Sequence, residues 1–442
     1  MSGRIFNSIL VAAALLLASG AVHAQTYTSN TPYSCFGVGD LYTQGGAYNK
    51  TMGGVGIATR TNRYFSVVNP ASITARDSLS FMADFSLYED NRYFRQGDIK
   101  SASNIMNIGN LAISFPITRH SAFMIGITPY SGTGYGYAYH IDDPAIIGRT
   151  GNISYSASGQ GGLYQFYAGG AVEFFKRLSL GAQFNYIFGQ NERKYFETFT
   201  DKSYNGAQNG YIMQLSGISG KFGIQYEQPV GAKGKLTIGA TYTTATPLKG
   251  YVEGYKYSTG TAASDTLFHR NDTLGINSKV HLAGEIGVGV NFRYDDKLMV
   301  EFDYTRSDWT GSGMDSTPGF MGNSNPSSSH SAFTTTVSQS FRAGVEYTPN
   351  RNDVRYYYRR ISYRAGVYRR NEYYKLDGHN VTSTGITLGA TLPVFRFYNG
   401  LSLGMDIGQR GVLANNLIRE RYIGFSVGIN IFDIWFQQPR YD

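Results

Sequence analysis

The chain has 442 residues, including 54 glycines, 36 tyrosines, 27 phenylalanines and one cysteine, and a formal net charge of +8. Charged residues make up 16%, whereas about a quarter is usual in soluble globular proteins. The 42% of hydrophobic residues exclude a disordered chain, and the single cysteine excludes a disulfide scaffold. After residue 25 no apolar run reaches the length of a membrane-spanning helix. A glycine- and tyrosine-rich all-β chain remains, and a transmembrane β-barrel fits it.

Residues 1–24 have the pattern of a signal peptide. Arg4 supplies the positive charge, residues 9–18 form a short apolar run, and Val22-His23-Ala24 resembles a cleavage site. We therefore expect export and a mature chain that begins at Gln25. Export leaves the periplasm, the exterior and the outer membrane as destinations, and it argues against nucleic acid as a partner of this basic chain.

The clearest strand pattern lies near the C-terminus. Over residues 422–434, glycine and small polar residues alternate with the large apolar residues Ile423, Phe425, Val427, Ile429 and Ile431. Period-two alternation indicates a strand. A second face of glycine and small polar groups suits a crowded or watery barrel lumen.

The same pattern recurs and predicts fourteen strands, at 78–88, 106–117, 121–138, 161–175, 177–198, 208–229, 233–247, 279–294, 296–306, 335–348, 359–370, 381–395, 398–410 and 421–435. Long loops are expected at 89–105, 139–160, 248–278 and 307–334, and medium ones at 199–207, 371–380 and 411–420. Short turns that alternate with long loops are typical of outer-membrane barrels. We therefore predict an all-β fold, a 14-stranded antiparallel transmembrane β-barrel over residues 78–436. Its place is the outer membrane of a Gram-negative bacterium, with both termini and the tail 437–442 in the periplasm.

Residues 25–77 do not follow the barrel pattern. They are rich in glycine and end in a short apolar segment around Val67 and Val68. A barrel of fourteen strands has a lumen wider than its own side chains can fill. We therefore expect this segment to form an N-terminal hatch in the lumen.

Two motifs in this segment resemble the FadL family of outer-membrane transporters of hydrophobic compounds. The first contains the hatch glycines Gly53, Gly54 and Gly56, and the second is Asn69-Pro70-Ala71, shortly before the first strand. The resemblance implies a fourteen-stranded barrel with an N-terminal hatch, in which Asn69, Pro70 and Ala71 form the hatch motif.

The third predicted strand is the candidate site of a lateral opening. In the family that the chain resembles, this strand is kinked and opens a gap in the wall beside the hatch. Here it contains Pro129, which cannot donate a ladder hydrogen bond, and Gly132 and Gly134, which weaken pairing. The alternative is that Pro129 marks the aqueous end of a shorter strand.

Several charged residues fall on inward faces of the predicted strands, and the candidate lumen charges are Glu285, Glu301, Asp303, Arg342, Glu346 and Arg364. One interpretation is that they form cross-strand and hatch-anchoring ion pairs. The other is that they bind a charged headgroup of a substrate, such as a carboxylate at Arg342 or Arg364.

The sequence offers no recognisable catalytic chemistry. No histidine pair has metal-ligand spacing, and the single Cys35 excludes a thiolate cluster. The glycine-rich stretches lack the Gly-Lys-Ser/Thr of a phosphate-binding loop. We therefore expect no enzyme activity, no cofactor and no metal.

Two functions remain open. The first is passive uptake of small hydrophobic or amphipathic compounds, released laterally through the wall near the hatch. The second is a role as a non-transporting subunit of an outer-membrane secretion or assembly machine, as in PorV-like relatives of the FadL family. The expected partners are outer-membrane lipid, a hydrophobic ligand for the first function and other envelope proteins for the second.

Overall fold

The computed structural model describes residues 28–64, 66–77, 79–141, 143–201, 203–259, 264–274, 279–322, 333–394, 399–415 and 417–434. The predicted signal peptide at 1–24 and the predicted tail at 437–442 lie outside the described residues. Among the described residues, no helix has the length and apolar character needed to cross a membrane.

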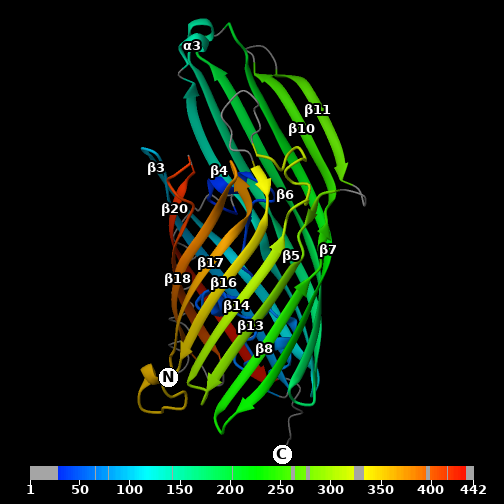
Figure 1. Cartoon of the computed structure of the whole chain (residues 1–442), viewed down its shortest axis with the longest axis vertical. Helices are drawn as coiled ribbons and strands as arrows, with labels where there is room; N and C mark the ends of the chain where they lie inside the picture. The colour runs from blue at the N-terminus through cyan, green and yellow to red at the C-terminus, as the bar shows by residue number, and fades with distance from the viewer. Residues whose placement is uncertain are drawn as a thin grey trace, which may run out of the picture.

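The described strands form a closed antiparallel barrel of fourteen strands, as predicted (Figure 1). In chain order they are β2 (Ser80–Gln96), β3 (Ile99–Thr118), β4 (Ser121–Ile141), β5 (Ile153–Phe174), β6 (Leu178–Phe199), β7 (Gly206–Val230), β8 (Gly234–Thr243), β13 (Glu285–Tyr294), β14 (Leu298–Asp308), β16 (Val337–Tyr347), β17 (Ser362–Leu376), β18 (His379–Pro393), β19 (Gly400–Arg410) and β20 (Arg419–Ile434). The barrel closes where β2 pairs with β20, with Ser80 opposite Ile434.

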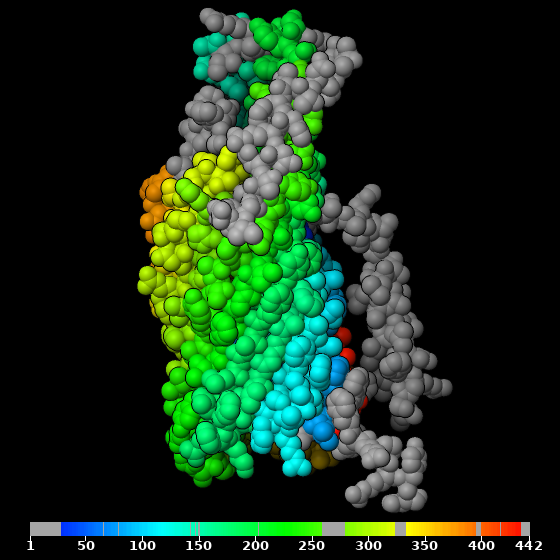
Figure 2. Space-filling model, turned by 90° about the vertical axis from the view of Figure 1, so that its right-hand side faces the viewer, coloured from blue at the N-terminus to red at the C-terminus, as the bar shows by residue number. Residues whose placement is uncertain are grey.

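The outer wall is apolar, as the alternation indicates. On β20, Ile423, Phe425, Val427, Ile429 and Ile431 have exposed fractions between 41% and 50%, whereas Asn430 on the opposite face is buried. Figure 2 shows the smooth outer wall that the green and cyan strands build side by side. Large apolar side chains that face outward all round a closed barrel are typical of a surface covered by lipid.

A lysine on this apolar face should be costly. We expect Val427→Lys, in the middle of the outward row of β20, to lower the free energy of unfolding by about 2–4 kcal/mol, because a cation would lie in hydrocarbon. Denaturant unfolding in lipid vesicles measures the change. The control is Val412→Lys, an exposed residue between β19 and β20, which should shift stability by no more than about 0.5 kcal/mol. Equal effects would contradict a lipid-facing role for β20.

At the end of the barrel that carries the long connections, here called the loop end, the strands are longer than predicted. The expected loop at 89–105 is wrong, because β2 and β3 continue to a turn at Gly97. The expected loop at 371–380 is wrong for the same reason, since β17 and β18 meet at a turn through Asp377 and Gly378. In these stretches aromatic residues stand next to one another among polar ones, as in Tyr93-Phe94 and Tyr373-Tyr374, so the alternation that reveals a strand disappears.

Half of the expected loop at 139–160 and most of the expected loop at 248–278 are strand. β4 and β5 extend to a short helix, α3 (Pro144–Thr150), and β10 (Lys249–Thr259) and β11 (Ser264–Leu274) form a hairpin that pairs with β7. These elements rise above the rest of the barrel in Figure 1. Further short strands near this end are β9 (Thr246–Pro247), β12 (His281–Leu282) and β15 (Phe333–Thr335).

The opposite end, here called the turn end, carries short connections. The longest of them contains η3 (Tyr357–Arg359), so the predicted strand at 359–370 begins later, at Ser362. Arg359 lies in this turn rather than on the outer wall, with its guanidinium 4.9 Å from the ring centre of Tyr356.

The described residues before the first barrel strand lie inside the barrel. They form η1 (Pro32–Cys35), β1 (Asp40–Leu41), α2 (Ala47–Lys50) and η2 (Pro70–Thr74), joined by irregular backbone. Most of their side chains are buried, and their polar groups contact the inner faces of strands on several sides of the barrel, as described below. We call residues 28–77 the lumen segment.

Candidate functional site: the lumen segment and the wall around it

The Asn-Pro-Ala motif lies against the wall at β6 and β7. Asn69 caps η2, because its Oδ1 accepts a hydrogen bond from the Ala71 N–H at 3.0 Å, and its Nδ2 donates to the carbonyls of Ile57 at 2.7 Å and Ile224 at 3.2 Å. The wall has a glycine where Asn69 approaches, since a Cβ on Gly223 would lie 2.0 Å from Asn69 Oδ1. The motif therefore links two parts of the lumen segment to the barrel.

The hatch glycines allow the backbone of the lumen segment to approach the strands. Gly53 and Gly54 have φ values of +72° and +81°, which favour glycine. A Cβ on Gly53 would lie 2.9 Å from the carbonyl oxygen of Val367. The Gly53 N–H donates to Thr387 Oγ1 at 2.7 Å, so this turn is held directly by β18.

Two of the predicted lumen charges bind consecutive amides of the lumen segment. Asp303 Oδ2 accepts hydrogen bonds from the N–H groups of Gly56 at 2.7 Å and Ile57 at 3.0 Å. Glu301, two residues earlier on β14, accepts from the N–H of Ala58 at 2.9 Å. The two carboxylates therefore bind the backbone of residues 56–58.

Glu346 and Arg364 form a second contact with the lumen segment. Their side chains pair at 2.8 Å, and Arg63 of the lumen segment lies 3.7 Å from the other Glu346 oxygen. The Arg364 guanidinium also lies 4.5 Å from the ring centre of Tyr48 and 4.7 Å from that of Tyr64. A buried cation held between a carboxylate and two aromatic rings is well stabilised.

The remaining two predicted charges, Arg342 and Glu285, line the same cavity inside the barrel. Arg342 donates to the carbonyl of Gly54 at 3.3 Å. Glu285 lines a small cavity together with Lys221 and Arg342. The structure thus brings Arg342 to the lumen segment, and Glu285 faces the space beside it.

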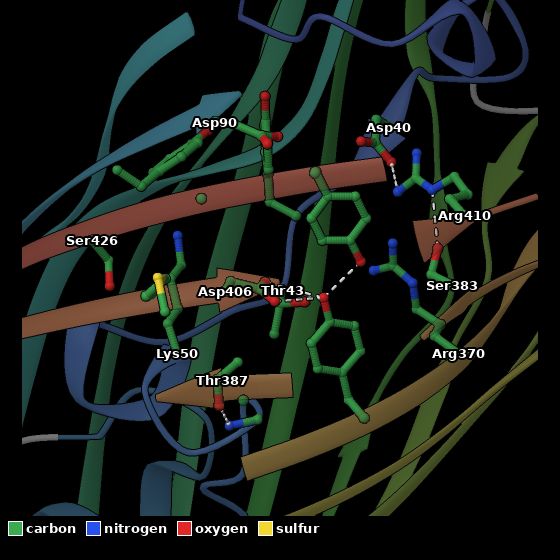
Figure 3. Close-up of a pocket in the computed structure, with 18 of the residues that line it drawn as sticks. Asp40, Thr43, Lys50, Asp90, Arg370, Ser383, Thr387, Asp406, Arg410 and Ser426 are labelled. Atoms are coloured by element: carbon green, nitrogen blue, oxygen red, sulfur yellow. Dashed lines mark hydrogen bonds and ion pairs between the residues drawn. The ribbon is translucent and has the colours of Figure 1, made fainter. Parts of the chain in front are cut away.

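A buried charge cluster that the sequence did not indicate joins the lumen segment to four strands, and Figure 3 shows three of its members, Asp40, Arg370 and Arg410, beside a cavity. We call it the Asp40 cluster, and its members are Asp40, Arg92, Arg370, Glu372, Arg410 and Glu420. The shortest pair joins Arg410 Nη2 to Asp40 Oδ1 at 2.8 Å. Glu420 accepts hydrogen bonds from Arg92 at 3.0 Å and from Thr31 of the lumen segment.

Burial and charge set the protonation of the lumen segment near this cluster. Burial of the Asp40 carboxyl opposes ionisation, yet the guanidinium groups of Arg410, Arg92 and Arg370 hold its pKa below the usual value. Burial lowers the pKa of Lys50 to about 8, although neighbouring carboxylates favour its charged form. The space next to the Asp40 cluster is therefore strongly polar.

The cavities inside the barrel are small. One, of about 170 Å³, lies between the Asp40 cluster, Lys50, Asp406 and the hydrogen-bonded hydroxyls of Tyr368 and Tyr422. The other, beside Glu285, has a volume of about 140 Å³. A dry apolar cavity of about 150 Å³ holds a benzene ring, so the size would suffice for a small aromatic compound, but charged groups line both cavities.

The wall is interrupted between β3 and β4. The ladder between these strands runs from Thr118 up to Leu111, which pairs with Ile127. Beyond that pair, among the described strands, β3 pairs with β2 alone, and β4 pairs with β5 and, at Ser131 and Gly132, with β1. The β4–β5 register shifts next to Pro129.

Residues at the start of the lumen segment occupy the lower part of this interruption. Asn107 Nδ2 of β3 donates to the Thr28 carbonyl at 2.9 Å, and the Gly134 N–H of β4 donates to Ser34 Oγ at 3.0 Å. Residues 28–34 therefore lie between β3 and β4 and form hydrogen bonds with both strands. Gly132 and Gly134 leave room for the backbone of Thr28 and Ser29, since a Cβ on Gly134 would lie 1.7 Å from the Ser29 carbonyl oxygen.

A methyl group at this position should displace the start of the lumen segment. We expect Gly134→Ala to make a cysteine at Ser29, which is 2% exposed, react with a maleimide at least about tenfold faster, because overpacking costs about 1–3 kcal/mol. The labelling rate is measured in a Cys35→Ser background. Gly136→Ala is the control, since a Cβ there meets no atom within 4 Å. The same labelling rate in both variants would contradict close packing of Ser29 against Gly134.

The described residues contain no group of three or more histidine, cysteine, aspartate or glutamate side chains that could hold a metal ion. The buried polar groups instead contact one another and the lumen segment. This arrangement binds a segment of chain inside a barrel, and its chemistry is that of buried ion pairs and backbone hydrogen bonds.

Comparison with solved structures identifies the class of fold. The toluene transporter TodX of Pseudomonas putida matches with a TM-score of 0.60 and 13% identity, over 90% of this chain and 100% of that one. The toluene transporter TbuX of Ralstonia pickettii matches with a TM-score of 0.56 and 13% identity, over 88% and 98%. The CymD monoaromatic hydrocarbon channel gives 0.55 and 12%, over 88% and 97%. The chain therefore has the fold of the FadL-like outer-membrane β-barrels.

Comparison with family models identifies the family of the chain. A family model named BamG matches residues 5–442, and the chain belongs to the BamG family. A search of curated proteins gives no match. The predicted resemblance to FadL thus holds for the fold, whereas the matching family carries a different name.

Proposed function

We propose that this protein is a non-transporting barrel subunit of a multi-protein machine in the outer membrane of a Gram-negative bacterium. The turn end, with the end of β20, would face the periplasm, and the loop end would face the exterior. The observation that carries the proposal is the way the lumen segment is fixed. Buried charges and backbone hydrogen bonds tie it to β14, β16, β18, β19 and β20.

Opening such a lumen would be costly. Withdrawal of the lumen segment would leave Asp303 and Glu301 without their amide donors and would separate Asp40 from Arg410. Breaking one buried ion pair costs about 3–5 kcal/mol when the remaining charge stays buried. Several such contacts together favour a permanently closed barrel over a channel that opens for each molecule.

A second candidate function is a passive channel for small hydrophobic compounds. It is favoured by the fold shared with proteins described as toluene transporters and by the interruption between β3 and β4. In this case a compound would leave laterally, past residues 28–34, and the Asn69-Pro70-Ala71 motif would move with the hatch. The charged cavities beside Lys50 and Glu285 are poorly suited to such a ligand.

Extraction from the native outer membrane in mild detergent, without overexpression, tests the two candidates. For a machine subunit we expect migration on a native gel in one large complex, with the same co-purifying envelope proteins in each preparation. A single chain that accelerates toluene entry into proteoliposomes would overturn the proposal and support the channel. Proteoliposomes with a barrel of unrelated fold serve as the control for leakage.

A further inference from the structure

The upper part of β4, at the loop end, presents an unpaired strand edge. Above Ser131 and Gly132, which pair with β1, no described strand lies next to β4 on the side of β3. Residues 136–140 are exposed on both faces of the strand. We propose that this edge binds an extended segment of a second envelope protein by strand addition.

The backbone polar groups of this edge point into the interruption. Both the N–H and the carbonyl of Gly134 bond to Ser34 Oγ of the lumen segment, at 3.0 and 3.2 Å. In an antiparallel sheet, the N–H and C=O of one residue point to the same side, and the direction alternates along the strand. Gly136 and Ala138 therefore present their N–H and C=O groups to the same side as Gly134, above the lumen segment.

The chain itself shows that this edge accepts extended backbone. Asp40 and Leu41 pair with Gly132 and Ser131 in antiparallel register. The Tyr42 N–H also donates to the Tyr130 carbonyl at 3.0 Å. A partner segment would continue the same mode of contact a few residues further along β4.

A cleft beside this edge offers space for such a segment. It has a volume of about 620 Å³ and lies between residues 134–137 of β4 and residues 99–105 of β3, with Ser29, Asn30 and Pro32 of the lumen segment at its base. Its walls combine aliphatic and aromatic side chains, such as Ile99 and Tyr137, with main-chain polar groups. Tyr137 is 39% exposed and Ile99 is 74% exposed.

The chemistry of the edge favours a peptide over a lipid. Exposed edges of strands bind other strands because a peptide supplies both donors and acceptors at the right spacing. An acyl chain has neither, so it would leave the N–H groups of Gly136 and Ala138 without partners. Natural proteins often protect an exposed edge with proline or a bulge, and Gly134–Ile141 contains no proline and keeps a regular register with β5.

This inference rests on the proposed function, because it names where another subunit of the machine binds. The test uses the full chain in its native membrane, with a photo-crosslinking phenylalanine derivative at Tyr137 and, separately, at Tyr139. Strand addition predicts crosslinks to one envelope protein, at two positions that are two residues apart in a single segment. The same probe at Tyr242, on the outer wall of β8, is the control.

A proline provides a matched test of the hydrogen bonds. Ala138→Pro removes an N–H that points away from β5, and edge strands tolerate such a change. It should lower the yield of the Tyr137 crosslink at least about tenfold, since proline cannot supply the donor that strand addition requires. Ala138→Val keeps the donor and should retain the yield. Unchanged heat-modifiable migration of both variants shows that the barrel is folded.

The outcomes separate this inference from the proposed function. Crosslinks to lipid, to a second copy or within the chain would overturn strand addition by a partner. An equal crosslink yield in Ala138→Pro would overturn it as well. If the protein still migrates in a large complex on the native gel in these cases, the proposal of a machine subunit keeps its support. Migration of the wild-type protein as a single chain would contradict both the machine subunit and strand addition by a partner.

Discussion

Replacing Arg410 by methionine should destabilise the folded protein by about 3–5 kcal/mol, because the buried carboxylates around it lose their shared cation. Arg410 lies within 2.8 Å of Asp40 and 3.4 Å of Glu372, and its side chain is almost fully buried. Methionine fills a similar length without the charge. The midpoint and slope of urea unfolding in vesicles give the change.

Two further variants make this result specific. The double variant Arg410→Met with Asp40→Asn should recover part of the loss, since one uncompensated charge is removed with its partner. Arg359→Met, in an exposed turn at the other end of the barrel, should have little effect. A wild-type midpoint for Arg410→Met would contradict the role of the Asp40 cluster in holding the lumen segment.

Replacing Gly366 by alanine should open the barrel to ions. Gly366 of β17 faces the lumen segment so closely that a Cβ would lie 2.3 Å from the backbone nitrogen of Gly53 and 2.3 Å from the carbonyl carbon of Met52. The atoms that a Cβ would meet belong to the backbone of Met52 and Gly53, which cannot change rotamer as a side chain can, so the lumen segment must move away from β17. Without the segment in place, a barrel of this size leaves an aqueous path.

Conductance of single molecules in planar lipid bilayers measures this opening. We expect the wild type to show no steady current and Gly366→Ala to show long-lived conducting states. Gly424→Ala is the matched control, because that glycine lines the cavity beside Asp406 and the nearest atom to a Cβ would be at 3.3 Å. A closed Gly366→Ala barrel would show that the lumen segment adapts without leaving its place.

Strands and inward-facing residues could be predicted from the sequence where alternate residues face lipid and the lumen. The row Ile423–Ile431 shows this, as does the inward placement of Glu301 and Asp303 on β14. Both follow from the period of two in a strand with one apolar side. The number of strands and the inward charges could therefore be predicted without knowing the path of the lumen segment.

The Asp40 cluster could not be predicted in this way. Arg92 and Glu372 lie in parts of β2 and β17 above the apolar band, where the predicted loops 89–105 and 371–380 were wrong. Adjacent aromatic residues among polar ones, as in Tyr93-Phe94 and Tyr373-Tyr374, hide the period of two that identifies a strand. Asp40, which pairs with Arg92 and Arg410, belongs to a segment without periodicity, so its position depends on tertiary contacts alone.

The contacts between the lumen segment and the last strand constrain the order in which the structure forms. Thr31 bonds to Glu420, 389 residues further along the chain, and β2 meets β20 to close the ring. Contacts so distant in sequence form slowly. The contacts of Thr31 and Arg92 with Glu420 cannot form before β20 is in place, so the start of the lumen segment acquires its final surroundings only as the barrel closes. A chain that lacks β20 would keep Arg92 without its Glu420 partner.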